Sequence, residues 1–236
     1  MKSILLSGAA LLLFVPSVLG QNTNMSFNGG YQGSNWTYGS ETVGTGFYDG
    51  AINGVQVGPG QSSPGMICDD FRDNVYAGET WTANAVSAGS LTSSNIGQTL
   101  FGSSIGLAGY QEVAYLVYQM FTTNPNAPTQ AAYSEAIWAL TGSGVAVSAL
   151  KAQGGLAWAL YLAVTSGTEK LTQSQLAGLW IYTPTVPGGN NAQEMWGMVP
   201  VPEGGATFGY LFLAGISCFG AMFLRSRRQT HPVRSA

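Results

Sequence analysis

The stretch that decides the fold is residues 110–140, which read YQEVAYLVYQMFTTNPNAPTQAAYSEAIWAL. Its apolar residues recur every three or four positions, the spacing that places side chains on one face of an α-helix. The first stripe comprises Tyr110, Val113, Ala114, Val117, Met120 and Phe121, and the second comprises Ala132, Tyr133, Ala136, Ile137 and Leu140. Pro125 and Pro128 separate the stripes, and Gly142 ends the second. The sequence therefore predicts two consecutive helices at the centre of the chain.

Short strands are predicted on both sides of these helices. Residues 27–57 alternate aromatic and small polar residues with many glycines, and Asn53-Gly54 marks a hairpin turn. Further strands are predicted at 66–68, 79–82, 179–183 and 193–196, with a turn at 188–191 joining the last two. A third helical stretch begins near Val145 and is interrupted at Gly154-Gly155. This order indicates an α+β domain with short antiparallel strands at both ends around a central helical segment.

The first twenty residues have the pattern of a secretory signal peptide. Lys2 precedes an uncharged apolar stretch over residues 4–19, and Leu19-Gly20 supplies an aliphatic and a small residue before a cut at Gln21. We therefore expect residues 1–20 to be removed and residues 21–200 to form one exported domain.

The C-terminal tail has three parts in a fixed order. Val201-Pro202-Glu203-Gly204 is followed by an uncharged apolar run over residues 207–224, and then by Arg225, Arg227 and Arg228. The run has the minimum length of a membrane-spanning helix, so the sequence predicts a single transmembrane helix at 207–224. The arginines are expected to hold its end, and residues 229–236, in the cytoplasm. A plain C-terminal anchor is the alternative interpretation.

Residues 201–228 resemble the PEP-CTERM sorting signal of Gram-negative bacteria. In that family an exosortase recognises the motif, cuts the chain there and releases or re-attaches the protein outside the cell. The resemblance implies an exosortase partner, a membrane-anchored precursor and a final location at the cell surface or outside the cell. The second proline of the family's Pro-Glu-Pro motif is replaced here by Gly204.

Composition narrows the functions that the exported part can have. Residues 21–206 contain three basic residues and all eleven acidic residues of the chain, a net charge of −8. This charge argues against nucleic acid and anionic membrane surfaces as partners. The single histidine, His231, lies beyond the apolar run, so the exported part has no Ser-His-Asp triad and no histidine metal ligand. We expect no cofactor and no enzymatic activity.

Cys68 is the single cysteine of the exported part, because Cys218 lies in the apolar run. Cys68 precedes Asp69-Asp70-Phe71, and Ala136-Ile137-Trp138 follows on the second helix, an arrangement similar to thioester-type surface domains. In those domains the cysteine bonds to a glutamine two positions before Ala-Ile-Trp, which is Ser134 in this chain. The resemblance implies a possible thioester between Cys68 and Gln130, one helical turn earlier. The alternative is that Cys68 is a small buried apolar residue.

Asp69, Asp70 and Asp73 lie within five residues of one another. Oxygen ligands at such spacing can hold Ca²⁺ outside the cell. The loop has neither the glycine turn nor the bidentate glutamate of an EF-hand. A solvated loop whose charge is partly neutralised by Arg72 is the alternative interpretation.

These observations favour a noncatalytic exported protein of the cell surface or extracellular matrix, associated with biofilm or exopolysaccharide and sorted by an exosortase. A covalent adhesin that uses Cys68 is the alternative. A polysaccharide-acting hydrolase is the third hypothesis, although Glu112 and Glu135 lie on different helices and nothing in the sequence pairs them. Four aromatic residues are candidates for stacking on sugar rings or for filling one face of a sheet: Trp36, Tyr38, Tyr48 and Trp81.

Overall fold

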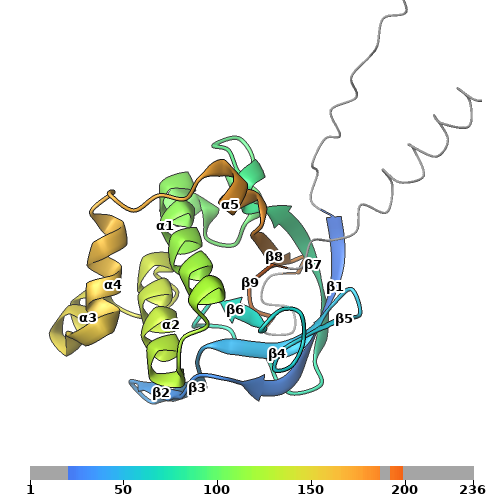
Figure 1. Ribbon diagram of the computed structural model, residues 1–236, viewed down its shortest axis with the longest axis horizontal. Coiled ribbons are helices and arrows are strands. Elements are labelled where there is room, and N and C mark those ends of the chain that lie inside the picture. Colours follow the sequence, from blue (N-terminus) through green and yellow to red (C-terminus); the bar gives the residue numbers. More distant parts are fainter. Residues whose placement is uncertain (1–20, 187–191, 199–236) are drawn as a thin grey trace, which may run out of the picture. The chain divides into compact units, whose positions relative to one another are not determined.

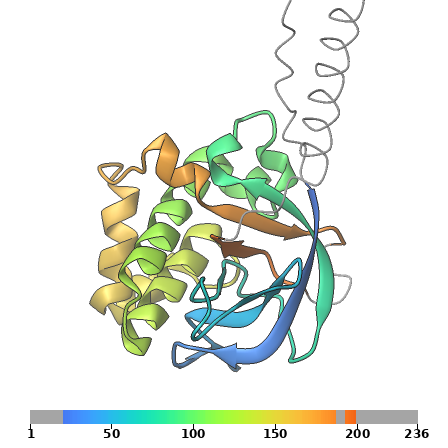
Figure 2. The same ribbon diagram turned by 45° about the vertical axis from the view of Figure 1, so that its right-hand side comes forward.

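The computed structural model describes residues 21–186 and 192–198, and its helices lie together on one side of its strands (Figure 1). The helices are α1 Gly102–Thr123, α2 Ala127–Thr141, α3 Val147–Gln153, α4 Gly155–Thr165 and α5 Gln173–Ala177, with single 3-10 turns at Ala88–Ser90 and Ile96–Gln98. The helical side and the strand side remain distinct when the molecule is turned (Figure 2).

The strands close on themselves. They are β1 Gln21–Tyr31, β2 Asn35–Tyr38, β3 Glu41–Gly44, β4 Phe47–Ile52, β5 Val55–Val57, β6 Met66–Cys68, β7 Thr80–Ser87, β8 Trp180–Pro184 and β9 Met195–Gly197. The main sheet has the order β1-β7-β8-β9-β6-β4-β5, and β4 also pairs with β1. Within the described residues, six strands therefore form a closed antiparallel barrel, β5 extends from β4, and β2 and β3 form a separate hairpin.

The predicted α+β arrangement, with separate groups of strands at the two ends of the domain, is wrong. Strands from both ends pair with each other: Val86 of β7 lies opposite Ile181 of β8, and Ile67 of β6 lies opposite Trp196 of β9. Local periodicity carries no signal for pairing between segments so far apart in the sequence. The strand at 66–68, the pairing of β8 with β9 and the Asn53-Gly54 turn between β4 and β5 are confirmed.

The two central helices are confirmed, and local signals set their ends. Asn124 adopts a left-handed conformation with φ 41° and donates its backbone N–H to the Met120 carbonyl, which closes α1. Asn126 caps α2 by accepting a 3.2 Å hydrogen bond from the Thr129 amide. The predicted helical interruption at Gly154-Gly155 separates α3 from α4, where both glycines have positive φ angles.

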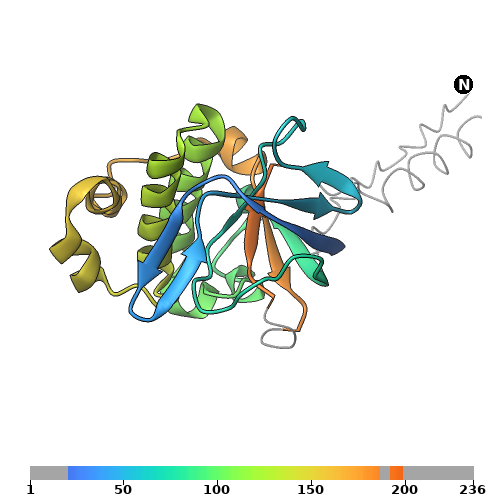
Figure 3. The same cartoon turned by 90° about the horizontal axis from the view of Figure 1, so that it is seen from below.

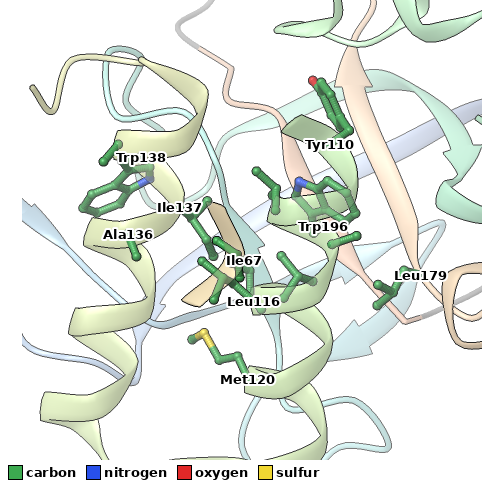
Figure 4. Close-up of a cluster of buried hydrophobic side chains, with 14 of the residues drawn as sticks. Ile67, Tyr110, Leu116, Met120, Ala136, Ile137, Trp138, Leu179 and Trp196 are labelled. Carbon is green, nitrogen blue, oxygen red and sulfur yellow. The ribbon is translucent and has the colours of Figure 1, made fainter. Parts of the chain in front are cut away.

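Alternating strand residues divide the core into two layers. Ile67, Ile181 and Trp196 belong to a buried cluster with side chains of the helices. Figure 4 shows Ile67 and Trp196 beside Leu116 and Ile137. Their neighbours along the strands fill the barrel interior, to which all six strands contribute: Met25, Tyr48, Ile52, Met66, Cys68, Trp81, Ala83, Ala85, Tyr182 and Met195. The short strands β6 and β9 are buried on both faces, whereas β7 alternates buried and more exposed residues over its first half.

The β2–β3 hairpin projects from the barrel toward the helices (Figure 3). Trp36 stacks on Tyr38 with ring centroids 5.3 Å apart and lies 5.8 Å from the Trp138 ring of α2. The Tyr38 hydroxyl accepts a 3.2 Å hydrogen bond from the Ala146 amide. The hairpin is therefore anchored to the helical layer by aromatic packing.

No helix within 21–186 or 192–198 is both long and apolar enough to cross a membrane. The predicted signal peptide at 1–20, the turn at 188–191, the sorting motif and the predicted membrane helix at 207–224 lie outside the described residues.

Candidate functional site

Two buried carboxyl groups meet where β6 and β9 run side by side. Cys68 lies opposite Met195 in this pair, so Asp69 and Glu194 occupy adjacent positions just beyond it, and the Asp69 amide donates to the Glu194 carbonyl at 3.4 Å. Both side chains are completely buried. Sequence reasoning missed Glu194, because a single acidic residue beside a short strand gives no local signal.

Glu194 has more hydrogen-bond donors than Asp69. Its Oε1 accepts from the Tyr110 hydroxyl at 2.5 Å, and its Oε2 accepts from the Leu100 amide at 2.8 Å and from the Thr183 hydroxyl. Asp69 Oδ2 accepts from the Trp196 indole N–H at 2.7 Å, and Asp69 Oδ1 has no partner.

Burial raises the pKa of the Asp69 carboxyl well above its usual range, and the nearby Glu194 carboxylate raises it further. Burial also raises the pKa of Glu194, although the donors that surround this carboxylate oppose the shift. Of the two groups, Glu194 is therefore the one that more readily stays ionised, and Asp69 is the one that more readily holds a proton. A proton held by Asp69 leaves the two groups with one negative charge between them, which reduces the cost of burying both carboxyls together.

The carboxyl pair is a structural link. Through Tyr110, Leu100, Thr183 and Trp196, it ties α1 and the segment before it to β8 and β9. Two completely buried side chains offer no surface to a substrate, so their hydrogen bonds act within the fold.

The three aspartates proposed as calcium ligands have different surroundings. Asp70 Oδ1 accepts from the Arg72 amide at 3.0 Å, whereas Asp69 is directed to Trp196. In the part of the chain that the structure describes, no group of three acidic, histidine or cysteine side chains is arranged to hold a metal ion. The alternative of a solvated loop is also wrong for Asp69 and Asp70, which are buried. Burial, followed by the neighbouring Asp73, raises the pKa of Asp70 to about 7.

Cys68 is buried in the barrel interior, as its apolar interpretation predicted. Its thiol donates to the Asp70 carbonyl at 3.0 Å, and the Trp138 indole N–H donates to the Cys68 carbonyl at 3.1 Å. Burial raises the pKa of this thiol well above its usual range, and the charges of Asp70 and Asp69 add to the effect. The thiolate that a nucleophilic cysteine needs is therefore disfavoured.

Gln130 and Ser134 hold the start of β4 against α2. Gln130 Oε1 accepts from the Phe47 amide at 3.2 Å, and its Nε2 donates to the Pro125 carbonyl at 2.8 Å. Ser134 Oγ accepts from the Gly46 amide at 3.0 Å. No hydrogen bond joins Gln130 to Cys68, so the structure gives the two residues of the proposed thioester separate roles.

An aromatic pocket of about 300 Å³ opens beside the Asp70–Asn74 loop. It is lined mainly by Phe27, Tyr31, Tyr48, Phe71, Tyr76 and Trp138, with Asn74 and Gln193 among its polar residues. Of the four aromatics proposed to stack on sugars, only Tyr48 lines it. Tyr48 and Trp81 belong to the barrel interior, which confirms the sheet-face interpretation for these two residues.

A second cavity, of about 370 Å³, lies among α1, α4 and α5. Its lining includes Glu112, Glu169 and Lys170, and burial raises the pKa of Glu112. Glu135 does not take part, because it is buried on α2 and accepts a 2.9 Å hydrogen bond from Gln153. Glu112 and Glu135 therefore do not form the acid–base pair of a hydrolase.

No protein-family model, curated protein or solved structure matches the chain. No relative therefore indicates a function, and the sequence motifs of the chain itself carry the functional conclusion.

Proposed function

We propose that the chain is a noncatalytic exported protein of the cell surface or extracellular matrix, sorted by an exosortase-type enzyme. The order of motif, apolar run and arginine cluster over residues 201–228 is the observation that carries the proposal. The same order makes an exosortase the expected processing partner, and we expect an exopolysaccharide as the matrix partner of the mature protein.

The barrel lies between the two expected cuts. Gln21, the expected first mature residue, already pairs with Ala85 in the ladder between β1 and β7. β9 ends at Gly197, shortly before the motif that begins at Val201. Removal of residues 1–20 and of the tail after Glu203 therefore leaves every strand of the barrel intact, which supports an exported domain between two processing signals.

The test is the mass of the mature protein in a host that encodes an exosortase. The wild-type chain should begin at Gln21 and end near Glu203. Glu203→Gln and Pro202→Ala should leave the tail attached, whereas Gly205→Ala, outside the motif, should be processed normally. Recovery of a wild-type membrane form that still carries Arg225–Arg228 would contradict the sorting function and favour a plain anchor.

Hydrolysis of a polysaccharide is a second candidate function, favoured by the cavity that contains Glu112 and Glu169. The raised pKa of Glu112 suits a general acid. The test measures the release of reducing ends from neutral and acidic polysaccharides. Release by the wild-type chain that is lost in Glu112→Gln and retained in Glu135→Gln would support an enzyme. If the wild-type chain releases no reducing ends, hydrolysis is excluded for these substrates and the noncatalytic function stands.

A further inference from the structure

We propose that the aromatic pocket binds one neutral sugar residue of a polysaccharide. The inference deepens the proposed matrix function and rests on it, because it names the chemical class of the matrix partner. The apolar C–H face of a pyranose ring packs well on aromatic rings, and its hydroxyl groups need polar partners at the rim. The pocket supplies both kinds of surface.

Two exposed tyrosines stand at the pocket. Tyr76 is 58% exposed and Tyr31 is 39% exposed, and both belong to its lining. A turn holds Tyr76 in place: its amide donates to Glu79 Oε2 at 2.8 Å, and the Glu79 amide donates back to its carbonyl at 2.9 Å. The Tyr31 hydroxyl donates to Asn35 Oδ1 at 2.5 Å. The Tyr31 ring is thus held by its hydroxyl and the Tyr76 backbone by the turn, which lowers the entropy that a stacking ligand has to remove.

The Asn74 side chain is the polar group at the pocket that can bind a sugar hydroxyl, and Gln193 supports it. Asn74 is half-buried, and its side-chain amide makes no hydrogen bond within the described residues. Gln193 Nε2 donates to the Asp70 carbonyl at 2.9 Å and also to the Asp73 carbonyl, so it fixes the loop that carries Asn74. Gln193 Oε1 is buried without a partner. An amide held beside aromatic rings is a suitable donor and acceptor for vicinal hydroxyls.

The charges around the pocket select against anionic sugars. No charged side chain lines it. Asp73 and Glu79 flank Asn74 and Tyr76 along the chain, and both are acidic. The nearby Arg72 directs its guanidinium to the Gly142 carbonyl at 3.4 Å. A uronate or sulfated sugar would therefore meet like charge, whereas a neutral hexose would not.

The pocket volume of about 300 Å³ lies at the small end of the range for ligand sites. A pocket of this size accommodates a single ring, so the rest of a polysaccharide chain would extend into solvent. The affinity of one pocket for one sugar residue should be modest. A repeating polymer that contacts many copies of the protein would be bound more tightly through multivalency.

The test is calorimetric titration of the purified full chain with cellohexaose and maltohexaose as neutral probes and hexaguluronate as the anionic probe. At least one neutral probe should bind, and hexaguluronate should not. Tyr76→Ala and Asn74→Ala should each weaken binding about tenfold, the loss expected for one stacking or hydrogen-bonding contact. Tyr76→Phe should retain binding, because it keeps the ring.

Leu156→Ala is the matched control, since Leu156 is 49% exposed on α4 and does not line the pocket. Unchanged melting temperatures would show that the variants fold. Binding of hexaguluronate alone, binding of no probe, or equal binding by Tyr76→Ala and the wild-type chain would each overturn the inference. Processing of the tail is measured independently, so a correctly cut chain that binds no sugar would refute the ligand and leave the proposed function standing.

Discussion

Asp69, Asp70 and Glu194 bind protons more tightly in the folded chain than in the unfolded chain. Burial raises the folded-state pKa of each above its ordinary value. The stabilisation that results is fully present below the unfolded pKa and is lost as the pH rises through the folded pKa. For Asp70 this window extends from 3.8 to about 7.

The domain should therefore become less stable as the pH rises from about 4 to about 7, by on the order of 1–3 kcal/mol in the free energy of unfolding. Asp70→Asn keeps the acceptor for the Arg72 amide and removes the titration, so it should flatten the upper part of this dependence. Urea unfolding at several pH values measures the effect. Glu41→Gln, an exposed change on β3, is the control, and an unchanged pH profile in Asp70→Asn would contradict the role of Asp70.

Asp69→Asn and Glu194→Gln should differ in their effects at neutral pH. An asparagine at position 69 resembles the protonated acid and should change the unfolding free energy by less than about 1 kcal/mol. Glu194→Gln replaces one acceptor oxygen of the side chain by an NH₂ donor. Because Tyr110, Thr183 and Leu100 all donate to this side chain, the change should lower the free energy of unfolding by about 2–4 kcal/mol. The reverse order would place the shared proton on Glu194.

Cys68 should react slowly with thiol reagents in the native chain, because it is buried and its pKa is raised. Cys68→Ala should cost about 1 kcal/mol, the effect of a small cavity. Native protein treated with methylamine should keep its mass. An added methylamine that disappears in Cys68→Ala would instead establish an acyl bond and support the covalent adhesin.

At the scale of elements, α2 holds the barrel through two polar side chains. Gln130→Ala should leave the Phe47 amide without its acceptor, and Ser134→Ala should do the same to the Gly46 amide. Each change should lower the free energy of unfolding by about 1–3 kcal/mol, as expected for a buried group that loses its partner. Gln111→Ala, exposed on α1, should have little effect. Equal midpoints for Gln130→Ala and Gln111→Ala in urea would show that the link is unimportant.

Elements defined by local signals were predictable, and those defined by distant partners were not. Asn53-Gly54, Asn124 and Gly142 mark turns or helix ends in any context, so the hairpin and the central helices followed from the sequence. Closure of the barrel depends on which strand lies next to which, and that information is distributed over the whole domain. The aromatic pocket was missed for the same reason, because Tyr31 and Tyr76 come together only through the fold.

At the scale of the whole molecule, β9 completes the barrel between β8 and β6. A chain that ends after residue 200 should therefore keep the melting temperature of the full domain. A chain that ends after residue 192 loses β9 and Glu194 and exposes the free edges of two strands, so it should fail to fold cooperatively. Circular dichroism during heating compares the two. A cooperative transition in the shorter chain would show that closure is dispensable.

The position of β9 also determines when the domain can fold as the chain is made or transported from its N-terminus. β7, which ends at Ser87, must wait for β8, which begins at Trp180, and the gap between β8 and β6 stays open until Gly197 has emerged. Long-range pairing of this kind makes folding slow and late. The predicted sorting motif at Val201–Gly204 follows β9 within a few residues, so the barrel can close only when that motif is about to emerge. If the chain is exported as we propose, the barrel would therefore close only near the end of its passage through the membrane.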